Sequence, residues 1–420
     1  MSQRQWTATS RLLLLAACCL AATTAAAQTV GDVVSAVRSE GPFPADGAAT
    51  DLVAFDEFGL GCKRCCDPCA DCGPCGPCDP CGDVGGGCGS HGGHGLKHNR
   101  ADARGPAHIF GDHVHKRCEW MVEYLYMNMY MDGNRSGTDS LTVPEAFTVG
   151  QALGTNNAAT PTNMTMEMHM LHIMYGMTDE VTLYVMPMWW SNTMDHLRAT
   201  PFGPNPPLAG TPFTTHNSGF GDLVFGGLWK IYETEYDEWI VNLGFSVPTG
   251  DIDRTTTVPT GLVAQEFPYP MRLGSGTFDF RPGVTYKRFW EYWSMGLQAQ
   301  FDLPLDRNTE NYRMGNEYRA NAWIARVLDC EKRWAVSFRV EGLFRSNFVG
   351  ADPNLNSATI STNDPDMRGG EFVNFGYGVM YRNPKLGRLS VEAAHRVYQN
   401  LRGVQLETDW SLAASWAKKF

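Results

Sequence analysis

The chain has 420 residues, of which 43% are hydrophobic and 19% charged, and its formal net charge is −11. Such a surface repels phosphates, and no basic stripe interleaved with aromatic residues is present, so nucleic acid is excluded as a partner. Beyond the first 27 residues no apolar run approaches the roughly 18 residues that a membrane helix needs. By length alone, the remainder fits two or three soluble domains or one large β-barrel.

Residues 1–27 have the features of an export signal. Arg4 and Arg11 precede the apolar run "LLLLAACCLAA", and the small residues that follow suit cleavage after Ala27. An alternative takes "LAAC" as a lipobox with acylation of Cys18, but the apolar run before it is short. Either way, the mature chain is expected to leave the cytoplasm.

Residues 28–60 form a weakly patterned stretch, predicted to be a flexible leader, and residues 61–107 form a Cys/Gly/His-rich low-complexity segment. The repeated C-x-x-C spacing indicates either disulfides, favoured in an exported protein, or sequestration of copper or zinc. Loss of Cys18 and Cys19 with the signal leaves an odd number of cysteines. The candidate metal ligands of this segment are Cys62, Cys65, Cys66, Cys69, Cys72, Cys75, Cys78, Cys81, His91 and His94.

From residue 119 onward, runs of ten to twelve residues alternate between apolar and polar side chains and are separated by turn residues. In Thr277 to Arg288, for example, Phe278 and Phe280 share one face while Asp279 and Arg281 share the other. About twelve such strands are predicted, near 119–131, 164–176, 181–190, 221–232, 239–248, 277–288, 292–303, 318–328, 334–345, 371–382, 389–398 and 408–420. Short and long connections alternate along the chain.

This pattern predicts an all-β fold, a closed antiparallel transmembrane β-barrel over residues 108–420. Strands in a soluble sandwich are usually shorter, and nothing there forces loop lengths to alternate. Tryptophans cluster around the short turns, where an interfacial girdle is expected. At the C-terminus, Trp416 and Phe420 share one face and are similar to the assembly signal of bacterial outer-membrane barrels. The expected partners are therefore outer-membrane lipid and the barrel assembly machinery.

Many short motifs, among them "SGFGDL", "NLGFSVPTGDID", "PYPMRLGSGTFDFRPGVTY" and "DPDMRGG", resemble the transporter-like outer-membrane barrels of the MetA-pathway of phenol degradation family. The resemblance covers roughly residues 108–420 and implies a barrel with a transporter-like role and no defined solute. Cys118 stands where a small residue such as glycine is expected. The Cys-rich segment is outside the resemblance.

Methionines recur at even positions of "NMTMEMHMLHIMYGM", together with His172, so they share one face of an extended strand. One interpretation is a flexible apolar surface that faces lipid or is packed, and the lipid-facing case would make Glu167 and His169 lumen residues. A second is a face that lines the pore, and a third is a set of soft ligands for Cu(I). The candidate metal ligands on this strand are Met166, Met168, Met170 and His172.

The polar faces of the other strands are expected to converge inside the barrel, where their charges either pair and fill it or line a polar path. With Glu167 and His169, the lumen candidates are Asp279, Arg281, Gln298, Gln300, Asp302, Arg339, Glu341, Arg345, Glu392 and Arg396. No cofactor is otherwise indicated.

No enzyme signature is present: Ser390 and His395 alternate to opposite faces of one strand and cannot act together. Three functions remain open. The first is an outer-membrane channel or transporter-like barrel that passes a small solute. The second is a copper- or zinc-handling protein, and the third is a structural anchor for the Cys-rich segment, which is expected to lie in the periplasm.

Overall fold

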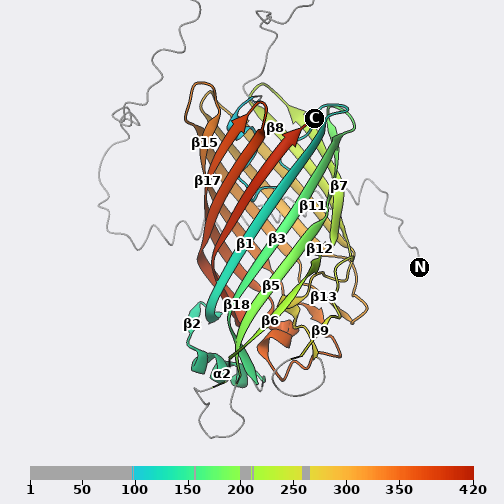
Figure 1. Ribbon diagram of the computed structural model, residues 1–420, viewed down its shortest axis with the longest axis vertical. Helices are drawn as coiled ribbons and strands as arrows, with labels where there is room; N and C mark the ends of the chain where they lie inside the picture. The colour runs from blue at the N-terminus through green and yellow to red at the C-terminus, as the bar shows by residue number, and fades with distance from the viewer. Residues whose placement is uncertain (1–96, 98, 156–157, 199–209, 211, 258–264) are drawn as a thin grey trace, which may run out of the picture.

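The computed structural model describes residues 97, 99–155, 158–198, 210, 212–257 and 265–420, and these form a closed antiparallel β-barrel (Figure 1). The predicted fold class is confirmed. Eleven strands make the ring. Around the barrel they are β1 (Trp120–Gly137), β18 (Gly387–Lys419), β17 (Gly370–Asn383), β15 (Trp334–Arg345), β14 (Glu317–Val327), β12 (Trp293–Pro304), β11 (Asp279–Phe289), β8 (Asp237–Val247), β7 (Leu223–Glu233), β4 (Val181–Met186) and β3 (Ala159–Gly176), which pairs with β1.

Strand β18 has 33 residues and doubles back on itself. Its first arm pairs with β17 from Gly387 to Leu401, and its second pairs with β1 up to Lys419. The arms are antiparallel, because the Trp416 indole donates a hydrogen bond to the carbonyl of Leu386, 30 residues earlier. The eleven ring strands therefore supply twelve crossing segments, which agrees with the predicted strands near 389–398 and 408–420.

Two ring strands, β4 and β7, are extended at the end with the long loops. Strand β5 (Met188–Arg198) continues β4 after Pro187, and β6 (Pro212–Phe220) leads into β7 through Gly221 and Asp222. The remaining short elements lie in the long loops at this end of the barrel. They are β2 (Asp139–Leu141), α2 (Val143–Ala152), β9 (Thr255–Thr256), β10 (Gln265–Glu266), η3 (Tyr269–Met271), β13 (Tyr312–Arg313), β16 (Val349–Gly350), η4 (Ser361–Asn363) and η5 (Pro365–Met367).

The short turns all lie at the opposite end, together with the C-terminus (Figure 1). They connect β3 to β4, β7 to β8, β11 to β12, β14 to β15 and β17 to β18. Tryptophans at this end are exposed, as an interfacial girdle requires: Trp229, Trp239, Trp290, Trp293 and Trp334 are each at least 40% exposed. Within the described ranges, no helix is long and apolar enough to cross a bilayer.

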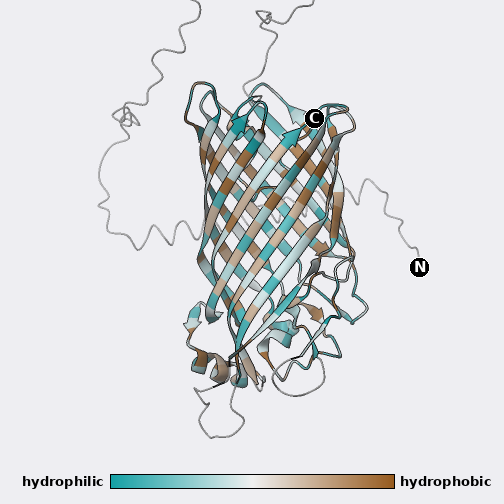
Figure 2. Ribbon diagram, in the orientation of Figure 1, coloured by the Kyte–Doolittle hydropathy of each residue, from teal (hydrophilic) through white to brown (hydrophobic). Residues whose placement is uncertain are grey.

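The outer surface carries a belt of exposed apolar side chains, and Figure 2 shows hydrophobic and hydrophilic residues alternating along the strands. Leu297 on β12, Phe338 on β15 and Val391 on β18 are outward and exposed, whereas their neighbours Gln298, Arg339 and Glu392 are buried. An apolar exterior on a sheet with no free edge in the ring satisfies the two demands that hydrocarbon makes of a spanning protein.

A further segment, residues 99–118, enters the barrel at the short-turn end and occupies that part of the lumen; we call it the inner segment. It includes η2 (Ala101–Ala103), and the amide of Ala101 donates to the carbonyl of Lys332 in the turn between β14 and β15. Deeper in, the Gln298 amide donates to the carbonyl of Phe110. The segment then returns, since the amide of Cys118 donates to the carbonyl of Gly176. Residues 99–107, which sequence analysis grouped with the low-complexity segment, thus lie inside the barrel.

Candidate functional site

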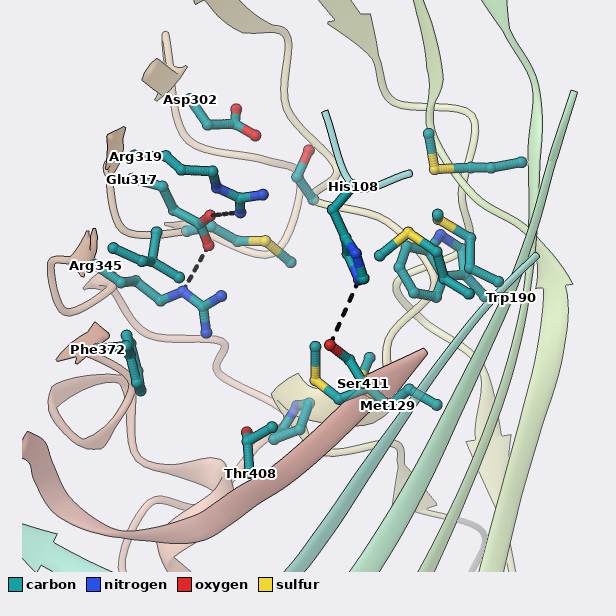
Figure 3. A pocket seen from close by; sticks show the side chains of 18 of the residues that line it. His108, Met129, Trp190, Asp302, Glu317, Arg319, Arg345, Phe372, Thr408 and Ser411 are labelled. Carbon is teal, nitrogen blue, oxygen red and sulfur yellow. Dashed lines mark hydrogen bonds and ion pairs between the residues drawn. The ribbon is translucent and has the colours of Figure 1, made fainter. Parts of the chain in front are cut away.

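The lumen holds a cavity of about 640 Å³ between the inner segment and the long loops. His108, Phe110 and Gly111 of the inner segment form part of its lining. This volume is in the range of small-molecule sites. Figure 3 shows that unlike side chains face one another across it, with Arg319, Arg345 and Phe372 on one side and Met129 and Trp190 on the other.

One side, which we call the methionine wall, is built by β1, β3, β4 and β5. Strand pairing aligns its thioethers: Met127 is opposite Met168, and Met129 is opposite Met166. On the next strand, Trp190 is opposite Met168. The lumen-facing members of the wall are Met127, Met129, Met131, Met164, Met166, Met168, Met170, Met186, Met188, Trp190 and Met194.

This arrangement reverses the predicted orientation of β3. The methionines face the lumen, while Glu167 and His169 lie on the outer face of the strand. There Nδ1 of His169 is hydrogen-bonded to the Tyr124 hydroxyl at 2.7 Å. The Tyr126 hydroxyl donates a hydrogen bond to Glu167 at 2.7 Å. Glu167 and His169 are therefore not lumen residues, and the interpretation of the methionine face as lipid-facing was wrong.

Polar atoms interrupt the methionine wall at three buried residues. His172 lies 3.8 Å from Glu123, measured from Nδ1 to the nearest carboxylate oxygen, and in the described part of the chain neither of its ring nitrogens has a hydrogen-bond partner. The side-chain amide of Asn192, which is opposite Met166 on β5, also lacks partners there, as does Nδ1 of His196. Hydrogen-bonding capacity is thus left over on an otherwise apolar surface.

The other side, the charged wall, is built by β11, β12, β14, β15, β17 and the first arm of β18. At its base, the guanidinium of Arg339 donates to Glu341 at 2.5 Å and to Glu392 at 2.6 Å, and all three side chains are buried. Glu392 also accepts from the backbone amide of His108 at 3.0 Å. Because Glu392 binds both the wall and the inner segment, it fixes one to the other.

Farther toward the long loops, the pairs become more accessible. Arg345 donates to Glu317 at 2.6 Å, and Arg319 reaches the second oxygen of the same carboxylate at 3.4 Å. Arg281 forms a short ion pair with Asp302. Arg345 and Arg319 therefore share the single carboxylate of Glu317.

Three further polar residues of the charged wall bind the inner segment. The Gln298 and Gln300 amides donate to the carbonyl of Phe110 at 2.7 and 3.1 Å. Lys287 likewise donates to the carbonyl of Ala103 and lies 3.8 Å from Asp112. The predicted polar interior therefore has two roles, since one part holds the inner segment and the rest faces the cavity.

The long loops contribute a folded cover over part of the cavity. Arg272 bridges Asp352 at 2.6 Å and Glu266 at 2.9 Å, and its guanidinium stacks over the rings of Tyr269 and Tyr312. Burial, and then the nearby charge of Asp352, raises the pKa of Glu266. This cluster anchors the loop that packs Phe267 and Met271 against the methionine wall.

Most of the lumen residues predicted from sequence are inward-facing. Those that the structure places on the inner face are Asp279, Arg281, Gln298, Gln300, Asp302, Arg339, Glu341, Arg345, Glu392 and Arg396. Sequence analysis missed Arg319, although the alternation of β14 puts it on the same face as Glu317, and it missed the whole inner segment. Ser390 is buried on the inner face of β18, while the ring of His395 stacks on the exposed Tyr377 on the outer face of the barrel. The two side chains therefore lie on opposite faces, as the alternation predicts.

The metal candidates divide into two groups. Met166, Met168, Met170 and His172 lie together on the methionine wall. The candidates between Cys62 and His94 lie outside the described residues. Among the residues that are described, no group of three or more His, Cys, Asp or Glu side chains is arranged to hold a metal ion.

Comparisons with known proteins bear on the same region. The model of a family described as "Putative MetA-pathway of phenol degradation" matches residues 147–402. No curated protein sequence matches the chain. Among solved structures, the COG4313 outer membrane channel from Pseudomonas putida F1 is similar, with 13% identity, 74% of this chain and 97% of that chain covered, and a TM-score of 0.48.

Two further solved structures are similar at lower scores. The KdgM porin has 11% identity, with 70% of this chain and 98% of that chain covered and a TM-score of 0.31. A Pseudomonas aeruginosa FadL homologue has 12% identity, with 71% of this chain and 89% of that chain covered and a TM-score of 0.31.

Proposed function

The chain belongs to the putative MetA-pathway of phenol degradation family, whose model covers more than half of its residues, and from this premise we propose that it passes a small solute across the outer membrane. The single observation that supports this most is the cavity of about 640 Å³ inside a channel-like barrel. A barrel that served only as an anchor would be expected to fill its interior with packed side chains.

The inner segment gives the proposed path a closed end. It binds the wall through Glu392, Lys287 and Gln298, so passage requires that these contacts be broken or that the solute slip past Phe110. Because outer-membrane barrels have short turns on the periplasmic side, the chain would enter the barrel from the periplasm, and the long loops would face outside.

Liposome swelling with neutral solutes of increasing size tests this function. We expect the full chain to admit small solutes slowly, and Glu392→Gln to admit them faster, because the amide cannot hold the His108 backbone and Arg339 as the carboxylate does. Arg326→Gln, which changes an outward residue next to Trp293, is the control. If neither the full chain nor Glu392→Gln passes any solute, the proposal fails and anchoring becomes the better account.

A second candidate function is the handling of a soft metal ion, favoured by one observation. The thioethers of β1 and β3 face the lumen as opposed pairs, Met127 with Met168 and Met129 with Met166, and thioethers are ligands for Cu(I). Metal analysis of the full chain equilibrated with Cu(I) under reducing conditions, compared with Met166→Leu and Met168→Leu variants, tests this candidate. Equal copper in all of them would reject the methionine wall as a metal site.

A further inference from the structure

The cavity is lined by an arginine, Arg396, whose side-chain hydrogen bonds go to neutral groups. The guanidinium of Arg396 donates to the side-chain oxygen of Asn374 at 2.9 Å and to the Thr408 hydroxyl at 3.0 Å, and its carbon lies 4.3 Å from the centre of the Phe372 ring. In the described part of the chain no acidic group lies within ion-pair distance of it. Both hydrogen-bond partners are neutral, so they orient the guanidinium without cancelling its charge.

The surroundings of Arg396 add positive charge. Arg345 and Arg319 share the single carboxylate of Glu317, as described above. Arg368, in the loop before β17, donates to the carbonyl of Ser361, and its buried Nε has no hydrogen-bond partner among the described residues. Burial lowers the pKa of Arg368 to about 10, which still leaves it charged at neutral pH.

Arg396, Arg345, Arg319 and Arg368 all line the same cavity. A planar guanidinium held by stacking and by two hydrogen bonds is preorganised to bind a carboxylate, and its remaining donors are the ones that the protein does not use. Among the described residues no carboxylate forms an ion pair with Arg396, so an anion that enters the cavity can bind directly to the N–H donors that Arg396 does not use.

We propose that Arg396, together with Arg345 and Arg368 on the lining of the same cavity, forms an anion-binding subsite, and that the solute is a small organic anion whose apolar part lies against the methionine wall. This inference rests on the proposed function, since the solute must first enter the lumen. The subsite supplies the charge recognition. Met129, Met166, Met168 and Trp190 supply an adaptable apolar surface on the opposite side.

Both walls are needed for this assignment. A charged wall alone would select inorganic ions as readily as organic ones, and an apolar wall alone would favour neutral compounds. The alternative is a purely structural role, in which Arg396 only connects Asn374 on β17 to Thr408 on the second arm of β18. A structural role predicts that ligand binding does not depend on the charge of the ligand, whereas an anion-binding subsite predicts that it does.

Equilibrium dialysis of the detergent-solubilised full chain against three radiolabelled probes separates these alternatives. Hexanoate has both the charge and the apolar part, hexanamide lacks the charge, and acetate lacks the apolar part. We expect hexanoate to bind at least about tenfold more tightly than either of the others, the size of effect that one charged hydrogen-bonded contact supports. Equal binding of hexanoate and hexanamide would overturn the proposal.

Variants assign the effect to the subsite. Arg396→Gln should weaken hexanoate binding at least about tenfold and leave hexanamide binding unchanged, while Arg396→Lys should keep part of the preference because it keeps the charge. Arg345→Gln should weaken hexanoate binding less, and Arg326→Gln, outside the lumen, should have no effect. The heat-dependent gel mobility of each variant checks that its barrel is folded. Hexanoate binding unchanged in both Arg396→Gln and Arg345→Gln would refute the subsite.

The outcome is separable from that of the swelling experiment. Binding that depends on Arg396 without any solute flux would reject the channel and keep the subsite. Flux of neutral solutes without a preference for hexanoate would keep the channel and reject the subsite.

Discussion

The two walls of the lumen are built by the same alternation of side chains and have opposite polarity. On the charged wall the polar face of each strand points inward, as Arg281 and Asp302 do, and the apolar face meets lipid. On the methionine wall the apolar face of β3 points inward, and Glu167 and His169 point outward. Alternation along a strand therefore establishes that there are two faces, but it does not establish which of them is inside.

The physical reason lies in what each wall faces. Phe110 and Val114 of the inner segment pack against the methionines at one end of the cavity, and Phe267 and Met271 of a long loop pack against them at the other. This part of the lumen is consequently apolar, so an apolar wall is stable there. Outside, tyrosine hydroxyls satisfy Glu167 and His169, which removes most of the cost of placing them on the outer surface.

The largest effect should come from breaking the charged wall at Arg339. Arg339→Ala leaves Glu341 and Glu392 buried without their guanidinium, and losing one partner of such a buried group typically costs about 3–5 kcal/mol of unfolding free energy. Urea unfolding of the barrel in detergent, followed by tryptophan fluorescence, measures it.

The matched control is Arg326→Ala on the outer face near the girdle. Arg326 has a stacking contact with Trp293 and is exposed, so we expect a loss of about 0.5–1 kcal/mol. Equal losses in the two variants would show that the inward ion pairs contribute nothing special to stability.

The next effect tests which face of β3 meets lipid. Leu171→Arg places a charge on the outer face within the apolar belt, where such a substitution costs about 2–4 kcal/mol near the bilayer midplane. Glu167→Leu, on the same face, removes only a partner of the Tyr126 hydroxyl and should change stability by about 1 kcal/mol or less. Folding yields and urea midpoints in lipid vesicles measure both. If the methionines faced lipid, Leu171→Arg would place the charge in the lumen and would be tolerated.

Much of the fold follows from the sequence because the bilayer constrains it. Strands of ten or more residues, alternating loop lengths, tryptophans at the turns and the two arms at 389–398 and 408–420 are each local patterns, and each is confirmed. The inner segment is different. Arg100 lies in the range predicted as the Cys/Gly/His-rich segment, and Asp112 lies before the first predicted strand. Neither local pattern indicates that this segment lies inside the barrel, where Asp112 comes within 3.8 Å of Lys287.

The sequence predicts which charged residues line the candidate site, but it does not predict which of them form ion pairs with one another. Arg396 and Arg339 could be placed inside from alternation alone. That Arg339 meets two carboxylates while Arg396 meets none depends on register, since Asn374 is opposite Glu341 on one side and Arg396 on the other. The register between two strands depends on both strands and on the connection between them, so the alternation pattern of one strand does not determine it.

A smaller effect separates the shape of the methionine wall from its chemistry. Replacing Met166 and Met168 with leucine keeps the volume and the apolar character, and such exchanges usually cost less than about 1.5 kcal/mol each. We expect the barrel to fold and hexanoate to bind at most a few times more weakly. Equilibrium dialysis and urea unfolding of the same samples measure this. A complete loss of hexanoate binding would mean that sulfur, and not an apolar surface, is what the wall provides.

The smallest expected change in stability concerns Cys118. At this residue the inner segment, which lies in the lumen, leads into β1, a strand of the methionine wall. The backbone of Cys118 is left-handed, with φ of 64°, a conformation that costs a residue with a side chain about 1–2 kcal/mol. Glycine removes that strain but loses about 0.5–1 kcal/mol through the greater freedom of the unfolded chain, so Cys118→Gly should stabilise the barrel by about 0.5–1 kcal/mol. Cys118→Ser keeps the β-carbon and should bring no gain. Urea unfolding of the two variants side by side decides the point, because an equal gain in both would trace the effect to loss of the thiol and not to the backbone.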